Sequence, residues 1–147
     1  MASLGSKGMD ELLLSLEEIE RIPDSVVDEM LLAGGHVVED AHRASIRKYG
    51  LIDSRKLMDS VKVRRKIGRD QQRKVIVYPS GKRVSRHRKT LTKPVTNSEV
   101  GFVHEYGASR RNIPAKNWMS KANERCAAET TAAMYQVYDT WLKSLNL

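Results

Sequence analysis

The stretch "VGFVHEYGASRRNIPAKNWMSKANERCAAET", residues 100–130, decides the fold that the sequence predicts. Residues 99–107 alternate apolar and polar side chains up to a Gly, a pattern that is typical of a β-strand. A strand here would carry on one face Val100, Phe102, His104 and Tyr106. The stretch continues with a basic loop containing Pro114 and then a helical period that begins near Asn117, a plausible N-cap. The stripe of that terminal helix comprises Trp118, Met119, Ala122, Cys126, Ala133, Val137 and Trp141.

Two further strands are expected upstream of this stretch. Residues 60–66, "SVKVRRK", alternate, with Val61 and Val63 on one face and basic residues on the other. Residues 74–79, "KVIVYP", form a β-branched run, and the seven residues between the two segments suit a hairpin connection. Residues 80–98 show no element of their own, and a loop of this length is usually functional or disordered.

Helices are expected before the strands. Residues 9–22 have acids on one side and an apolar stripe on the other, made of Met9, Leu12, Leu13, Leu16 and Ile19. Pro23 ends this helix, and Asp24 or Ser25 can cap a second one that runs to about Tyr49. Gly50 then stands where helices often end in a left-handed turn. Gly34 and Gly35, inside the second helix, predict a kink or the close packing of another backbone.

The order of helix, helix, strands and helix predicts an α+β fold. We expect a small antiparallel sheet packed by a long N-terminal helix and a C-terminal helix, with a long basic loop. A chain of 147 residues is one domain on length. We therefore divide it into an N-terminal amphipathic helix, residues 1–23, and a single α+β domain, residues 24–147.

The positive charge of the chain is concentrated in one segment. Residues 62–93 contain 13 Lys or Arg against one acid, Asp70, a net of +12. Since the whole chain carries +8, the remainder carries −4 and is mildly acidic. The segment has a single aromatic residue, Tyr78, and so offers no series of stacking platforms for single-stranded bases. A solvated basic surface, contact with an acidic protein and contact with a phosphate backbone all remain open.

No constellation of residues points to catalysis, a metal or a cofactor. The four histidines have no metal-binding spacing, since His36 and His42 are six residues apart on one helix and His87 lies among arginines. Cys126 sits in the apolar stripe of the last helix and is interpreted as a core residue. No apolar run is long enough to span a bilayer, and a single cysteine excludes an internal disulfide, which favours a reducing compartment.

The opening stretch resembles the C-terminal signature of the tail-completion proteins of long-tailed bacteriophages, a head–tail joining or neck family that includes the minor tail protein Z group. Its Glu-aromatic-Gly element is matched by Glu105, Tyr106 and Gly107. Its Ala-rich, Pro-containing start of the final helix is matched by "PAKNWMSKA", residues 114–122. Upstream, "DSRKLMDSVKV", residues 53–63, is similar to the segment that leads into the family's first strand. In this chain Asn117-Trp118 replaces the usual Pro-Phe, and the loop of residues 80–98 is longer than usual.

The resemblance implies a structural virion protein, without catalytic, cofactor or metal sites. It implies a ring, hexameric in the family, at the head-proximal end of the tail, assembled in the host cytoplasm. Its neighbours would be the head connector and tail-terminator or tube proteins, with genomic DNA passing through the lumen. An apolar patch on the N-terminal helix also suits a ring subunit, which needs two matching surfaces.

Seven residues are predicted to face a partner or DNA. Four lie in the long loop and three in the elbow that links the last strand and helix: Arg83, Arg86, Arg88 and Lys89, then Arg110, Arg111 and Lys116. Arg suits this role because its planar fork binds a carboxylate with two hydrogen bonds. The alternative function is a small nucleic-acid-binding protein that uses residues 62–93. An enzyme is the third possibility, without a supporting residue pattern.

Overall fold

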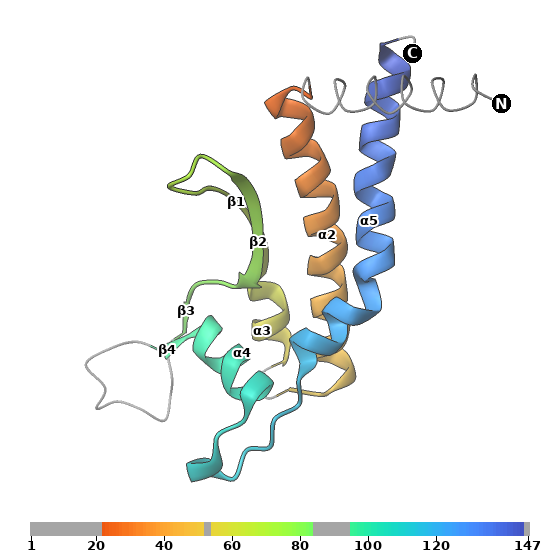
Figure 1. Cartoon of the computed structure of the whole chain (residues 1–147). Coiled ribbons are helices and arrows are strands. Elements are labelled where there is room, and N and C mark those ends of the chain that lie inside the picture. The colour runs from red at the N-terminus through yellow and green to blue at the C-terminus, as the bar shows by residue number, and fades with distance from the viewer. Residues whose placement is uncertain (1–21, 52–53, 84–94, 146–147) are drawn as a thin grey trace, which may run out of the picture.

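The computed structural model describes residues 22–51, 54–83 and 95–145 of the chain. They form an α+β fold in which a two-stranded antiparallel sheet packs against a long N-terminal and a long C-terminal helix (Figure 1). The described elements are α2 (Asp24–Lys48), α3 (Ser54–Ser60), β1 (Val61–Ile67), β2 (Arg73–Pro79), β3 (Lys82–Arg83), β4 (Val95–Thr96), α4 (Asn97–Tyr106), the 3-10 helix η1 (Ser109–Arg111) and α5 (Trp118–Ser144). This architecture confirms the predicted fold class.

Helices α2 and α5 lie side by side and run antiparallel (Figure 1). Near the start of α5, the Asn123 side chain bonds to His42 of α2 at 2.8 Å. Further along, a Cβ built on Gly34 would lie 2.9 Å from the Met134 side chain, so the two helices approach closely there. A larger residue at position 34 would require the Met134 and Thr130 side chains to move.

The hairpin of β1 and β2 lies on the other side of α2 from α5 in Figure 1. Its register runs from Val61 opposite Pro79 to Ile67 opposite Arg73, so the predicted hairpin is confirmed. A Cβ on Gly35 would lie 2.7 Å from the Val75 side chain and 2.8 Å from that of Val63. The sequence predicted a kink or the close packing of another backbone here. The atoms nearest to the paired glycines instead belong to side chains, of α5 at Gly34 and of the hairpin at Gly35.

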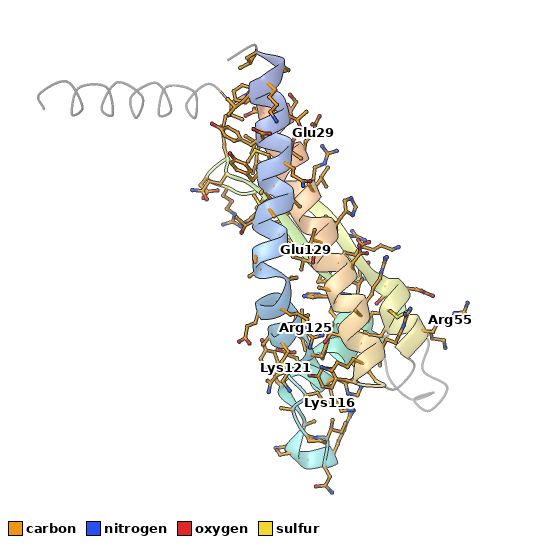
Figure 2. All side chains as sticks on the ribbon, turned by 90° about the vertical axis from the view of Figure 1, so that its right-hand side faces the viewer. Glu29, Arg55, Lys116, Lys121, Arg125 and Glu129 are labelled. Atoms are coloured by element: carbon orange, nitrogen blue, oxygen red, sulfur yellow. The ribbon has the colours of Figure 1, made fainter. Side chains whose placement is uncertain are left out.

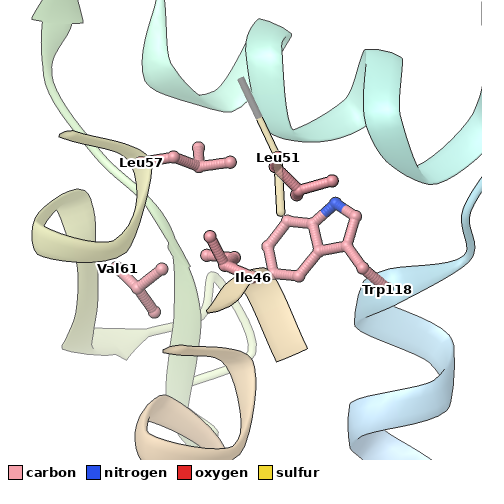
Figure 3. Packing of buried hydrophobic residues seen from close by; sticks show 5 residues of the cluster. All are labelled: Ile46, Leu51, Leu57, Val61 and Trp118. Carbon is pink, nitrogen blue, oxygen red and sulfur yellow. The ribbon is translucent and has the colours of Figure 1, made fainter. Parts of the chain in front are cut away.

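The hydrophobic core sits where α2 ends and α5 begins. Its buried cluster contains Ile46, Leu51, Leu57, Val61 and Trp118 (Figure 3). Trp118 has no exposed surface, and its Nε1 donates to the carbonyl oxygen of Gly101 in α4 at 2.9 Å. Cys126 is also buried, which confirms its assignment to the core.

The predicted third strand at residues 99–107 is wrong, because most of this stretch belongs to α4. Thr96 and Glu99 form a capping box, in which the Thr96 hydroxyl accepts from the Glu99 amide and the Glu99 carboxylate accepts from the Thr96 amide. The box satisfies free amide groups of the first helical turn. In a helix, residues four apart share a face, so His104 lies in the interior while Phe102 and Tyr106 stack on each other outside.

Two details of the helix ends also differ from expectation. α2 begins directly after Pro23 without a side-chain cap, and Asp24 instead pairs with Arg73 of the hairpin at 2.9 Å. Asn117 does stand at the N-cap of α5, but its side chain makes no capping bond. Gly50 has a φ of 53°, which confirms the left-handed residue after α2. The short helix α3 has no counterpart among the predicted elements.

Several predicted features lie outside the described residues. They include the amphipathic helix up to residue 21 and most of the long basic loop, with Arg86, His87, Arg88 and Lys89. The described ends of that loop pair as β3 and β4, Lys82 with Thr96 and Arg83 with Val95. The loop therefore starts from a short antiparallel ladder.

Replacing Trp118 with Ala should lower the free energy of unfolding by about 3–5 kcal/mol, because the change leaves a large cavity in the core. The Gly101 carbonyl would also lose its indole donor. Chemical denaturation followed by circular dichroism measures the loss. The matched control is Trp141→Ala, since Trp141 is only half-buried and should cost clearly less. Equal losses for the two variants would contradict the assignment of Trp118 to the core.

Candidate functional site

The strongest candidate surface is the elbow between α4 and α5, residues 107–117. It projects at the lower end of the molecule in Figure 1, with η1 at its tip. Its tip residues Arg110 and Arg111 are exposed. Neither arginine forms an ion pair with another residue of the described chain, so both guanidinium groups are available to a partner.

The elbow is closed by its own backbone. Gly107 has a φ of 78°, and a Cβ there would lie 2.8 Å from both the Ile113 oxygen and the Ala115 nitrogen. Only Gly fits a position that combines a positive φ with backbone contact this close. Ala108 and Ile113 exchange two backbone hydrogen bonds, of 2.9 and 3.1 Å, across the loop. The tip is thus held on a paired stem.

The base of the elbow joins α4 to the start of α5. The backbone amides of Lys116 and Asn117 donate to the carbonyls of His104 and Glu105, at 2.9 and 3.2 Å. The buried Glu105 carboxylate accepts from the amides of Met119, at 2.6 Å, and Ser120, at 3.2 Å, and also from the Ser120 hydroxyl. Glu105 therefore caps α5, the role that the sequence assigned to Asn117. A carboxylate at this position also suits the partial positive charge of a helix N-terminus.

A polar pair beneath the elbow links α2 to α5. The Ser45 hydroxyl donates to the Trp118 carbonyl at 2.7 Å, and the His42 ring meets the Trp118 indole edge-to-face at 5.5 Å. Burial lowers the pKa of His42 below its usual 6.5, although the bond to Asn123 and the Glu105 charge act in the opposite direction. A neutral His42 that donates from Nε2 fits this geometry, since its Nδ1 has no partner among the described residues.

Five cations lie in the elbow and in the first turns of α5, and we call them the basic elbow surface: Arg110, Arg111, Lys116, Lys121 and Arg125. Figure 2 shows Lys116, Lys121 and Arg125 following one another along one side of the start of α5. Lys116 Nζ donates to the Tyr49 carbonyl at 3.3 Å, and Lys121 Nζ lies 5.0 Å from the centre of the Tyr49 ring. Lys121 and Arg125 were not predicted as site residues, although their i, i+4 spacing places them on one helix face.

The basic hairpin is less free than its charge suggests. Arg73 contacts Asp28 at 2.7 Å and Asp24 at 2.9 Å, and Arg65 approaches Asp28 at 3.7 Å. These contacts tie the hairpin tip to the first turns of α2. Arg83 lies in β3, away from the elbow in Figure 1, so the structure brings together three of the predicted site residues, Arg110, Arg111 and Lys116.

The described residues offer little for catalysis or metal binding. Among them, no group of three or more His, Cys, Asp or Glu could hold a metal ion. His36 is exposed while His42 and His104 are buried in different elements. Within residues 22–51, 54–83 and 95–145, no helix is both long and apolar enough to cross a membrane.

No family model matches the chain, and neither the curated proteins nor the solved structures that were searched contain a significant match. What the protein does is therefore inferred from its elbow, its charges and the motif residues that build them.

Replacing Glu105 with Ala should lower the free energy of unfolding by about 1–3 kcal/mol, because two amides and a hydroxyl at the start of α5 would lose a charged acceptor. Thermal and urea denaturation measure this loss. Glu124→Ala is the matched control, since Glu124 is exposed on the first turns of the same helix and should change stability by less than about 0.5 kcal/mol. A loss no larger than that of the control would contradict the capping role.

The free energy of unfolding should fall as the pH drops below 6.5, the ordinary pKa of His. In this range the unfolded chain binds a proton at His42, whereas the folded chain does not, because burial lowers the pKa of His42. The loss grows until the pH reaches the folded pKa of His42. Urea denaturation at pH 7.5 and pH 5.5 measures it. His42→Gln should reduce the difference between the two pH values, whereas His36→Gln, at an exposed site on the same helix, should retain it. An unchanged difference in His42→Gln would contradict the assignment.

Proposed function

We propose that the protein is a structural subunit of a bacteriophage neck, forming a ring at the head-proximal end of the tail and joining the tail to the head connector. The basic elbow is the observation that carries this proposal. Its stem is closed by two backbone hydrogen bonds, it projects from the core, and its two arginines have no ion pair among the described residues. A pre-organised loop of this kind loses little entropy when it docks.

Three of the motif residues that suggested the neck family serve this elbow. Glu105 caps the helix that follows, Gly107 permits the backbone to close, and Trp118 anchors the far side in the core. This agreement between motif and geometry supports the proposal.

The distribution of charge also fits a ring subunit. The hairpin tip lies beside the start of α2, whereas the elbow projects beside the end of α2, at the other end of that helix (Figure 1). Subunits that assemble head to tail need two different surfaces, one for each neighbour. In the proposed hexamer the elbow contacts acidic residues of the adjacent subunit or of the next ring, which is the head connector or a tail-terminator or tube protein.

Reversing both tip charges, Arg110→Glu with Arg111→Glu, should leave the subunit folded but reduce the yield of joined particles at least tenfold. Opposite charges across an interface would become like charges, which repel. Mixing purified heads with tails that carry the variant, and counting joined particles by electron microscopy, measures the effect. The matched control is Arg55→Glu with Lys56→Glu, a pair of exposed neighbouring cations on α3 (Figure 2 labels Arg55).

Normal joining by the elbow variant would contradict the role of the elbow, and failure of both variants would indicate a general charge effect. Duplex DNA binding at several salt concentrations tests the alternative function. A nucleic-acid-binding protein would show tight binding whose affinity falls steeply with salt and depends on the cations of residues 62–93. A neck subunit whose elbow meets protein would lose joining without losing DNA affinity.

A further inference from the structure

The half of the helical pair that lies far from the core lacks a buried interior. We define this distal arm as residues 24–33 of α2 with residues 127–144 of α5. None of its side chains is buried, although the arm contains many apolar residues. The half-buried ones include Val26, Val27, Met30, Leu31, Ala133, Met134, Val137, Tyr138, Trp141 and Leu142. Amphipathic helices are stable in water chiefly when another element covers their apolar face.

Aromatic rings mark an uncovered face of the arm on α5. The Tyr135 and Tyr138 rings lie 6.3 Å apart, and the Tyr138 and Trp141 rings 6.0 Å apart, which forms a continuous row. Tyr135 is 61% exposed at one end of the row. A row of neighbouring rings offers far more apolar area than a solvated helix surface requires.

We propose that residues 9–21 of the same chain fold back as an amphipathic helix and cover the distal arm. The segment has the required stripe, Met9, Leu12, Leu13, Leu16 and Ile19. It joins the arm directly, since the described chain begins with Ile22 and Pro23 just before α2. Two residues are enough to connect antiparallel helices. Thirteen helical residues extend about 20 Å and the 18 arm residues of α5 about 27 Å, so the segment can cover about three quarters of the length of the α5 arm.

Charge favours the same placement. Residues 1–21 contain five acids and two basic residues, a net of −3. The hairpin tip beside the start of α2 presents Lys66, Arg69 and Lys74, none of which forms an ion pair with a described residue. The exposed Ile67, at 63%, lines a shallow cavity of about 200 Å³ together with Lys66 and Lys74. An acidic helix that ends here, at its connection to α2, would meet both the cations and the apolar side chain.

The short link between residue 21 and α2 favours docking of the segment from the same chain over docking of the same segment from a second copy. A segment joined through a short link has an effective concentration in the millimolar range at its own arm. A second copy at micromolar concentration competes poorly with it. Docking within one chain is therefore the arrangement that we assign to the free subunit.

Hydrogen exchange of the full chain, followed by mass spectrometry, tests the proposal. Leu16→Asp places a charge in the apolar stripe, so amides of residues 127–144 should exchange at least tenfold faster than in the natural chain. The matched control is Leu14→Asp, the same change two residues away on the opposite side of the predicted helix, which should leave these rates unchanged. Peptides from residues 118–126 provide an internal reference, because this part of α5 packs on the core.

Each outcome decides the proposal. A chain lacking residues 1–21 should match Leu16→Asp in the exchange of the distal arm. Equal exchange in the natural chain, Leu16→Asp and Leu14→Asp would overturn docking altogether. Protection that weakens when the protein is diluted a hundredfold would also overturn it, because the covering segment would then come from a second copy. Protection that is independent of dilution and lost only in Leu16→Asp and the shortened chain supports it.

Discussion

The fold depends on the packing of one side chain, the Trp118 indole, at the point where three helices meet. Its ring nitrogen donates to the Gly101 carbonyl of α4, its own carbonyl accepts from Ser45 of α2, and its ring lies against His42. A Cβ on Gly101 would lie 3.3 Å from the ring, so α4 approaches closely because it has no side chain there. Since Trp118 is the first residue of α5, one side chain fixes where that helix starts and how it crosses its neighbours.

This arrangement divides the helical pair into two parts that differ in packing. Near Trp118, α2 and α5 bury Ile46, Ala122 and Cys126, whereas the distal arm buries no side chain. Local stability follows buried apolar contact, so the proximal part should open only in global unfolding and the distal part at lower cost. The core is small for two helices of 25 and 27 residues, which explains why the paired glycines matter. They let side chains of α5 and of the hairpin approach α2 closely.

Most of the architecture could be predicted from the sequence, because periodicity and breakers are local signals. The alternation around Val61 and Val63, the long stripe from Trp118 and the left-handed Gly50 all identified their elements correctly. Residues 99–107 were wrongly predicted as a strand, because a short alternating run can also place residues at i and i+4 on one face of a helix. The Thr96-x-x-Glu99 capping box was visible in the sequence and would have indicated a helix. The cap that Glu105 provides for α5 was not visible, since it depends on where α4 ends in space.

The candidate surface was predicted in part for the same reason. Arg110, Arg111 and Lys116 follow from a basic loop between two elements, which a sequence displays directly. The pairing of Arg73 with Asp24 and Asp28 does not, because these residues are more than 40 positions apart and meet only through the packing of the hairpin on α2. Net charge in a segment therefore overestimated the number of cations available to a partner.

The closed stem of the elbow separates the residues that build the loop from those that a neighbour would touch. Gly107, Ala108 and Ile113 hold the stem through backbone atoms, and the side chains of Ser109, Arg110 and Arg111 play no part in the core. Substitutions at these tip positions should therefore change the free energy of unfolding very little. In the proposed role, the tip residues could therefore change to follow changes in the opposing protein while the scaffold stays fixed.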